Sequence, residues 1–167
     1  MSRLVVRDAH ADERDKVETL TRLAYDEFAT AMEPSAWKAL ESAMNAVLRD
    51  SADAQIIVAD DDGRIVGSVF LYPANARPYG DGDVLASPEF RLLAVAPNAR
   101  GRGVARALVE ECIRRAKAHG ATELGLHTSK SLTAAIALYE RLGFTRVPER
   151  DFQPEGAELV QGYRIGL

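Results

Sequence analysis

Apolar positions along the chain follow two periods, one typical of strands and one typical of helices. Residues 3–7 form a short β-type run. Residues 55–73 contain two β-rich runs around Asp62-Gly63, a strong hairpin signal. The run 88–97 (PEFRLLAVAP) is mostly apolar, which predicts a strand at the centre of a sheet. Two further strands are expected at 122–128 and 157–167.

Apolar residues at three- and four-residue steps predict helices between these strands. The four expected helices cover 13–32, 35–50, 103–120 and 131–144. A Gly-, Pro- and Asp-rich loop is expected at 74–87, and an irregular segment at 148–156. The order β-α-α-β-β-β-α-β-α-β, with room for one more strand, predicts an α/β fold with a mixed sheet and no linker.

Composition narrows the class of protein. The 167 residues are 47% hydrophobic, as in a globular domain. Lys and Arg total 21 against 25 Asp and Glu, for a net charge of -4, which argues against a nucleic-acid-binding protein. Cys112 is the only cysteine, so no intramolecular disulfide or cysteine metal site is expected. No apolar run approaches the roughly 20 residues of a membrane span, and we expect a cytoplasmic protein.

The stretch 95–111 (VAPNARGRGVARALVEE) is the strongest chemical signal. A strand enters it and a helix leaves it, so the unpaired N–H groups of the first helical turn offer an anion site. Gly101 and Gly103 remove side chains there, and Arg100 and Arg102 add positive charge. A phosphate-binding loop of the P-loop type needs a lysine that is missing, and a dinucleotide fingerprint needs a glycine where the chain has Arg106.

The segment Arg100-Gly101-Arg102-Gly103-Val104-Ala105 resembles the Arg/Gln-x-x-Gly-x-Gly/Ala signature of the GNAT superfamily of N-acetyltransferases. The preceding LLAVAP and the later LYERLGF fit the same family in order and spacing, over about 56–144. The resemblance implies one N-acetyltransferase domain over 1–167, classed as α/β (α+β). Its sheet would be mixed, mostly antiparallel, of six to seven strands flanked by about four helices. It also implies acetyl-CoA as cosubstrate and no metal.

By that resemblance, backbone amides of the turn hold the pyrophosphate of acetyl-CoA, and the strand before the turn pairs with its pantetheine arm. A backbone N–H of that strand would stabilise the oxyanion. The cofactor-binding residues expected are Leu93, Ala94, Val95, Arg100, Gly101, Arg102, Gly103, Val104, Ala105 and Arg106.

The resemblance makes Tyr139 the general acid that protonates the leaving thiolate. Many members of the family carry Asn seven residues earlier, where this chain has Leu132, so no side-chain contact with the cofactor is expected there. Cys112 lies on the apolar helix face and is expected in the core.

Glu89 is the candidate general base, because some branches of the family place a catalytic glutamate there. Strand alternation predicts that Glu89, Arg91, Leu93 and Val95 share one face. His127 is a weaker candidate, and a chain of water molecules is a third route.

The acceptor site is expected from segments 14–50, 74–87 and 148–160. Its predicted residues are Tyr25, Phe28, Trp37 and Phe152, with Met32, Tyr79, Asp81, Asp83, Glu155 and Glu158 nearby. Aromatic residues together with carboxylates suit a small cationic amine or a peptide N-terminus.

The predicted function is transfer of an acetyl group from acetyl-CoA to a primary amine of a small molecule or peptide, by direct attack through a tetrahedral intermediate. The alternative is a catalytically silent acyl-CoA-binding sensor or regulatory module. We expect no nucleic-acid or membrane partner, and family resemblance suggests a homodimer.

Overall fold

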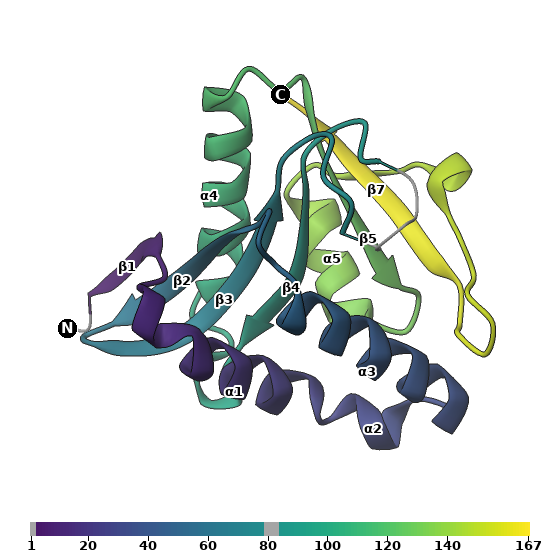
Figure 1. Cartoon of the computed structure of the whole chain (residues 1–167), viewed down its shortest axis with the longest axis horizontal. Helices are drawn as coiled ribbons and strands as arrows, with labels where there is room; N and C mark the ends of the chain where they lie inside the picture. Colours follow the sequence, from purple (N-terminus) through teal and green to yellow (C-terminus); the bar gives the residue numbers. More distant parts are fainter. Residues whose placement is uncertain (1–2, 79–83) are drawn as a thin grey trace.

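The computed structural model describes residues 3–78 and 84–167. These residues form one twisted sheet with helices on both faces (Figure 1). The strands are β1 (Leu4–Asp8), β2 (Gln55–Asp61), β3 (Arg64–Tyr72), β4 (Glu89–Val95), β5 (Glu123–Ser129), β6 (Thr145–Arg146) and β7 (Val160–Gly166). Their order across the sheet is β1-β2-β3-β4-β5-β7-β6.

Neighbouring strands in this part of the chain run antiparallel, except that β4 and β5 run parallel. The predicted fold class, a mostly antiparallel mixed sheet of six to seven strands, is confirmed. The central position predicted for the strand at 88–97 is also confirmed, since β4 is fourth of the seven. The extra strand is the two-residue β6, which pairs with β7.

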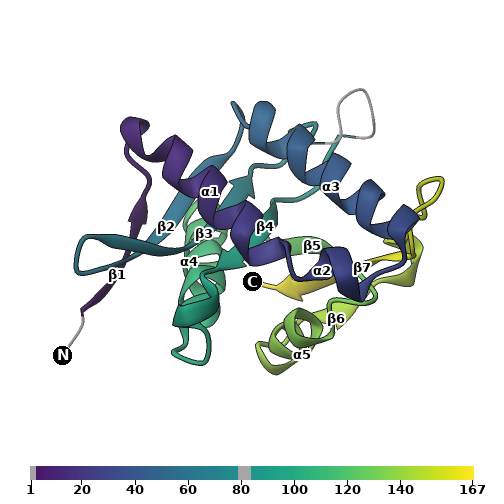
Figure 2. The same cartoon turned by 90° about the horizontal axis from the view of Figure 1, so that it is seen from below.

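The helices lie in two groups, one on each face of the sheet. Viewed from below, α1, α2 and α3 cover one face, while α4 and α5 cover the other (Figure 2). Their bounds are α1 (Arg14–Tyr25), α2 (Phe28–Ala31), α3 (Pro34–Arg49), α4 (Val104–Ala118) and α5 (Thr133–Arg141). Three short 3-10 turns occur at Ala11–Glu13, Pro97–Ala99 and Pro148–Arg150.

One helix was expected over 13–32, and the structure divides it. The chain turns at Asp26 and Glu27, so that four-residue α2 follows α1 at a corner. The guanidinium of Arg100 donates to the Ala24 carbonyl oxygen at 3.1 Å and binds both carboxylate oxygens of Glu27. These bonds attach the corner to the turn before α4, a tertiary contact that helix periodicity does not encode.

Each face of the sheet has its own core. Val104, Leu108 and Cys112 of α4 pack against Val69 and Leu126 on one face. On the other face, Val17 and Met44 of the first helices pack against Val58, Phe70 and Tyr72.

Gly67 in β3 allows α4 to approach the sheet closely. A Cβ atom at this position would lie 2.7 Å from a methyl group of Val104 and 3.0 Å from one of Leu108. Both neighbours are buried, so neither can move away without a cavity or a clash elsewhere. A glycine in the strand therefore sets how near the start of α4 comes to β3 and β4.

A β-bulge in β4 overturns the predicted alternation. Leu92 has φ 51°, and the pairing of β3 with β4 shifts register between Ser68 and Phe70. An inserted residue reverses the faces that follow it. Glu89 and Arg91 pair directly with Tyr72 and Phe70, so they face α1 and α3.

Beyond the bulge, Leu93 and Val95 pack into the core beneath α4. The prediction that Glu89, Arg91, Leu93 and Val95 share one face is therefore wrong. Along β4, Glu89 and Arg91 before the bulge therefore face α1 and α3, and Leu93 and Val95 after the bulge face α4.

Candidate active site

The strands β4 and β5 separate to open a cleft. Only the pair Glu89 and Gly125 joins them within the described residues, whereas β5 and β7 pair along seven successive positions. Figure 1 shows the two strands diverging toward their C-terminal ends. The cleft has a volume of about 1180 Å³ and is lined by residues of all five helices and of β4 and β5. The backbone edge of β4 after Phe90 thus borders a cavity.

The turn before α4 presents backbone N–H groups to this cleft. Gly101 and Gly103 have φ values of 75° and 79°, and Gly103 is the N-cap of α4. A Cβ atom at either glycine would meet no other atom within 4 Å. The glycines are therefore required by the backbone conformation, and they leave space for a ligand. The unpaired amides and the helix dipole suit a pyrophosphate.

The arginines of this turn already bind carboxylates of the protein. Arg100 binds Glu27 at 2.8 and 2.9 Å, Arg102 binds Asp61 at 2.8 Å, and Arg106 binds Glu110 at 2.7 Å. The ion pairs of Arg100 and Arg106 are exposed, so each of these two stabilises the fold only weakly and can exchange partners. The backbone amides, rather than these side chains, are therefore the candidate anion-binding groups of the turn.

Most of the predicted cofactor-binding residues line the cleft. Leu93, Val95 and the turn residues Arg100, Gly101, Gly103, Val104, Ala105 and Arg106 do so. Ala94 and Arg102 lie outside its lining: Ala94 is buried and pairs with Ser68, and Arg102 is directed to Asp61.

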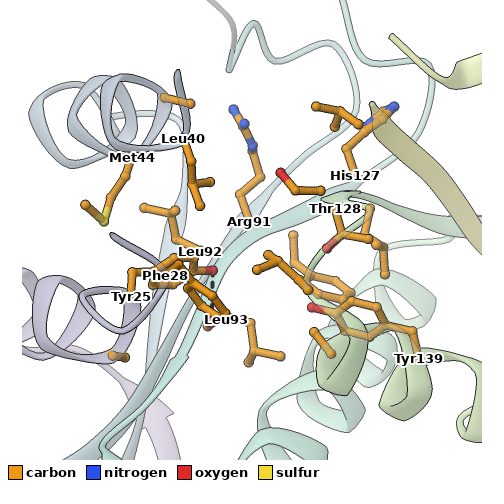
Figure 3. A pocket seen from close by; sticks show the side chains of 18 of the residues that line it. Tyr25, Phe28, Leu40, Met44, Arg91, Leu92, Leu93, His127, Thr128 and Tyr139 are labelled. Atoms are coloured by element: carbon orange, nitrogen blue, oxygen red, sulfur yellow. Dashed lines mark hydrogen bonds between the residues drawn. The ribbon is translucent and has the colours of Figure 1, made fainter. Parts of the chain in front are cut away.

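The side chain of Tyr139 enters the cleft from α5. Its ring packs edge-to-face against Phe90 and Phe144, with centroids 5.7 and 6.0 Å apart. Figure 3 shows its hydroxyl directed into the cleft toward β4. Burial raises the pKa of this hydroxyl well above its ordinary value. This tyrosine stays protonated and can donate a hydrogen bond or a proton, and the raised pKa also makes it a weaker acid than a free tyrosine.

Tyr25 binds the strand edge that was assigned to pantetheine. Its hydroxyl donates to the carbonyl oxygen of Leu93 at 3.1 Å, drawn as the dashed line in Figure 3. Burial raises the pKa of Tyr25 to about 12, against a smaller lowering by Arg91. A carbonyl oxygen has two lone pairs, so Leu93 can accept a second bond while it keeps Tyr25. Tyr25, which was predicted for the acceptor site, thus connects α1 to β4 at the edge predicted to bind pantetheine.

Glu89 is buried behind His127 rather than exposed to the cleft. Its carboxylate lies 3.2 Å from His127 Nδ1, and His127 Nε2 lies 2.9 Å from the carbonyl oxygen of Arg150. His127 lines the cleft, and Glu89 does not. Gly125 leaves room for this arrangement, because a Cβ there would lie 3.3 Å from Glu89 Oε1.

The partners of His127 determine how many protons the pair holds. A carbonyl oxygen only accepts, so Nε2 must carry a hydrogen and donate it to Arg150. The contact between Nδ1 and Glu89 then contains one shared proton, either on an imidazolium or on a carboxyl group. The two groups, considered separately in the sequence, therefore form one hydrogen-bonded pair.

The predicted acceptor residues are only partly brought together. Tyr25, Phe28 and Phe152 line the cleft, with the Phe152 ring centroid 5.2 Å from that of His127. Trp37 is half-buried on α3 and lies outside the lining. The remaining residues of this set are placed as follows: Glu155 and Glu158 line the cleft, Met32 is buried outside it, and Tyr79, Asp81 and Asp83 fall outside the described residues.

Arg91 is a cleft residue to which the sequence analysis assigned no function. It lies on the face of β4 toward α3 and donates to the Pro78 carbonyl oxygen at 3.4 Å. The available signal was a single charged residue inside the apolar run FRLLAV of a central strand. Without the bulge, that signal could not be assigned to a face.

Cys112 is fully buried, and burial raises its pKa to about 12, so it is a core residue as expected. Within 3–78 and 84–167, no group of three or more His, Cys, Asp or Glu residues is arranged to hold a metal ion. In the same residues, no helix is long and apolar enough to cross a membrane.

A relative of known sequence and two of known structure that resemble this chain are acetyltransferases. A mycothiol acetyltransferase of Geodermatophilus obscurus is 31% identical over 119 residues, which cover 71% of this chain and 38% of that protein. The chain thus spans well under half the length of this relative.

Two solved structures share the fold. One, described as histone acetyltransferase HPA2 and related acetyltransferase from Corynebacterium glutamicum, has a TM-score of 0.69 at 22% identity, covering 98% and 96% of the two chains. A GNAT family acetyltransferase from Brucella melitensis in complex with acetyl-CoA has a TM-score of 0.60 at 16% identity, covering 96% and 86%.

The model of the acetyltransferase (GNAT) family matches residues 17–144, most of the chain. The match includes most of α1, the bulged strand, the glycine turn and Tyr139. The resemblance inferred from the turn is thereby confirmed, and the chain belongs to the acetyltransferase (GNAT) family.

Proposed function

We propose that this chain transfers an acetyl group from acetyl-CoA to a primary amine. The observation that carries the proposal is one cleft in which a glycine turn at a helix N-terminus, an open strand edge and a buried tyrosine meet. The related structure with acetyl-CoA bound supports the choice of cosubstrate.

The residues present fit acetyl-CoA. Backbone amides from Gly101 through Arg106 would hold its pyrophosphate, since the glycines leave that side of the turn open. The edge of β4 from Leu93 to Val95 would pair with the pantetheine amides as an added strand does. When bound, the cosubstrate supplies an activated thioester carbonyl.

The chain's own groups would then act at two points. A backbone N–H of the β4 edge would donate to the oxygen that gains negative charge as the amine attacks the carbonyl. The Tyr139 hydroxyl would donate its proton to the departing sulfur, whose thiol has a pKa of about 8.5.

The Glu89–His127 pair would accept the proton that the amine loses. Since Glu89 does not line the cleft, we propose that a water molecule carries the proton to its carboxylate. His127, held by the Arg150 carbonyl oxygen, keeps that carboxylate in place.

Two measurements test the proposal. Saturating acetyl-CoA should raise the melting temperature, because a ligand that binds only the folded state stabilises it. Release of CoA thiol, measured across a panel of primary amines, should exceed the rate without an amine. No thermal shift at saturating acetyl-CoA would contradict the cosubstrate. A clear shift without turnover on any amine would instead support a binding module.

A further inference from the structure

Arg91 lies in the part of the cleft beside α1 and α3, which we call the acceptor half. It pairs with Phe70 of β3, so its side chain leaves the sheet toward α1 and α3. Figure 3 shows the guanidinium pointing into the cleft, between α3 on one side and His127 on the other. The residue is half-buried.

The wall beside Arg91 is largely apolar. Leu40 and Met44 of α3, Phe28 of α2 and Leu92 of β4 line this part of the cleft. Ligand pockets commonly combine such a wall with a few polar groups that fix the orientation of the ligand. A guanidinium in this position is the kind of group that fixes orientation.

The positive charge of Arg91 reaches groups on two other elements. Burial raises the pKa of Tyr25 in α1 and of Tyr72 in β3, and Arg91 acts on both in the opposite direction. Arg77 adds a second cationic side chain to the lining, while Asp50 at the end of α3 and Glu155 add carboxylates. Glu27 is bound to Arg100, and Glu158 accepts bonds from Ser131.

We propose that the acceptor is an amine with a carboxylate next to its nitrogen, as in an α-amino acid, and that Arg91 binds this carboxylate. The inference rests on the proposed function and specifies its substrate class. A guanidinium carries five N–H donors in a planar fork, and a carboxylate accepts two of them side by side. The contact with Pro78 is compatible with such binding.

The position of Arg91 relative to the proposed base supports this class of acceptor. Glu89 and Arg91 are two residues apart on one face of β4, about 7 Å along the strand. One small molecule can therefore direct its amine toward the Glu89–His127 pair and its carboxylate toward Arg91. The apolar wall of Leu40, Met44 and Leu92 would receive an apolar side chain.

An acceptor that carries a carboxylate is favoured beside a guanidinium. Like charge repels an ammonium group beside the guanidinium, whereas the carboxylate of an amino acid compensates for it. The guanidinium also favours the neutral form of a nearby amine, which is the form that attacks.

The test compares acceptors that differ only at the carboxyl group. The probes are L-phenylalanine and L-leucine, their C-terminal amides, and the decarboxylated amines phenethylamine and isopentylamine. We expect kcat/KM roughly 10- to 100-fold higher for each acid than for its amide, the scale of a charge-assisted bond. The comparison is conservative, because the amide has the less basic amine and so more of the attacking form at neutral pH.

Arg91→Gln should remove the preference. Its KM for L-phenylalanine should rise roughly 10- to 100-fold, with little change for L-phenylalaninamide and for acetyl-CoA. Arg91→Lys should recover part of the effect, since it keeps the charge but loses the fork. Arg49→Gln, which removes an exposed arginine at the end of α3, is the control. Melting temperatures establish that each variant is folded.

Binding measured by calorimetry on the CoA-loaded protein separates this proposal from the proposed function. Binding of L-phenylalanine but not of its amide, without turnover, supports the carboxylate site and contradicts the transferase. Equal or better turnover of the amides, or a preference that survives in Arg91→Gln, overturns the carboxylate site and leaves the transferase intact. Failure of both acids to bind and to react also overturns it.

Discussion

The half of the cleft beside α4 presents backbone groups, whereas the half beside α1 and α3 presents side chains. At the turn before α4, the glycines expose N–H groups, and the arginines are bound to Glu27, Asp61 and Glu110. Across the bulge at Leu92, Arg91 and the Glu89–His127 pair project from the opposite face of the sheet. A backbone site suits a cosubstrate shared by a whole family, while side chains can change with the acceptor.

The largest expected effect belongs to the tyrosine from α5 that joins the two halves. Tyr139→Phe removes the proton donor, and kcat should fall about 100-fold. Because burial raises the pKa of Tyr139, the wild-type hydroxyl stays protonated past its ordinary value of about 10. The kcat profile should therefore show no loss from this group below about pH 10.

Tyr163→Phe is the matched control, since it removes another buried tyrosine hydroxyl outside the cleft lining. Turnover should be unchanged in that variant. Full turnover of Tyr139→Phe at every pH would show that the general acid lies elsewhere.

On the acceptor side, Glu89→Gln should lower kcat/KM roughly 10- to 100-fold at neutral pH, because an amide cannot take up the proton. Activity should recover as the pH rises and the amine arrives already deprotonated. The pH profile measures this, with Glu18→Gln, an exposed carboxylate on α1 outside the cleft lining, as the control. A profile identical to the wild type would remove Glu89 from the mechanism.

On the backbone side, Gly103→Ala should weaken acetyl-CoA binding by about 10-fold or more. Gly63→Ala is the matched control: its φ is 87°, a Cβ there also meets open space, and it lies in the hairpin turn away from the cleft. Both variants should lose roughly 1–2 kcal/mol of folding free energy. Calorimetry should find the loss of affinity in Gly103→Ala alone, and equal affinities would argue against the backbone site.

Tyr25→Phe tests the hydrogen bond that joins α1 to β4 between the two halves of the cleft. Loss of its bond to the Leu93 carbonyl oxygen should cost about 1 kcal/mol of stability. The Kd for acetyl-CoA should change by no more than about threefold, because a single neutral bond at one end of a long backbone site is affected. Denaturant unfolding and calorimetry measure the two quantities. A Kd raised by an order of magnitude would mean that Tyr25 itself forms part of the cofactor site.

The smallest effect is expected for Arg100→Gln. Its ion pair with Glu27 is exposed, so acetyl-CoA affinity should fall by less than about threefold. The acetyl-CoA affinity of Glu27→Gln should also change by less than about threefold, or rise slightly. A large loss in Arg100→Gln at low salt would make the arginines, rather than the amides, the principal anion site.

The cofactor half could be predicted from the sequence because its determinants are local. Gly101, Gly103 and the following amphipathic helix specify a turn and a helix start within a few residues. Tyr139 followed from the spacing of a second motif, and the fold class from the order of apolar patterns. Predicting these features requires no information about contacts between residues far apart in the sequence.

The acceptor half depends on contacts that residue spacing does not reveal. The bulge at Leu92 changed the face of Leu93 and Val95 relative to Glu89, which strict alternation could not foresee. The first helix is interrupted at Asp26 and Glu27, next to the bond between Arg100 and Ala24, and Trp37 lies outside the cleft lining. Nor could spacing show that Arg150, over twenty residues away, orients His127.

In the proposed cofactor site, backbone amides of 101–106 hold the pyrophosphate of acetyl-CoA. An NMR titration of the 18.2 kDa chain with acetyl-CoA observes these amides directly. The amide signals of Gly101 through Arg106 should move most, and their hydrogen exchange should slow. Binding of acetyl-CoA that leaves these amides unshifted and unprotected would contradict it.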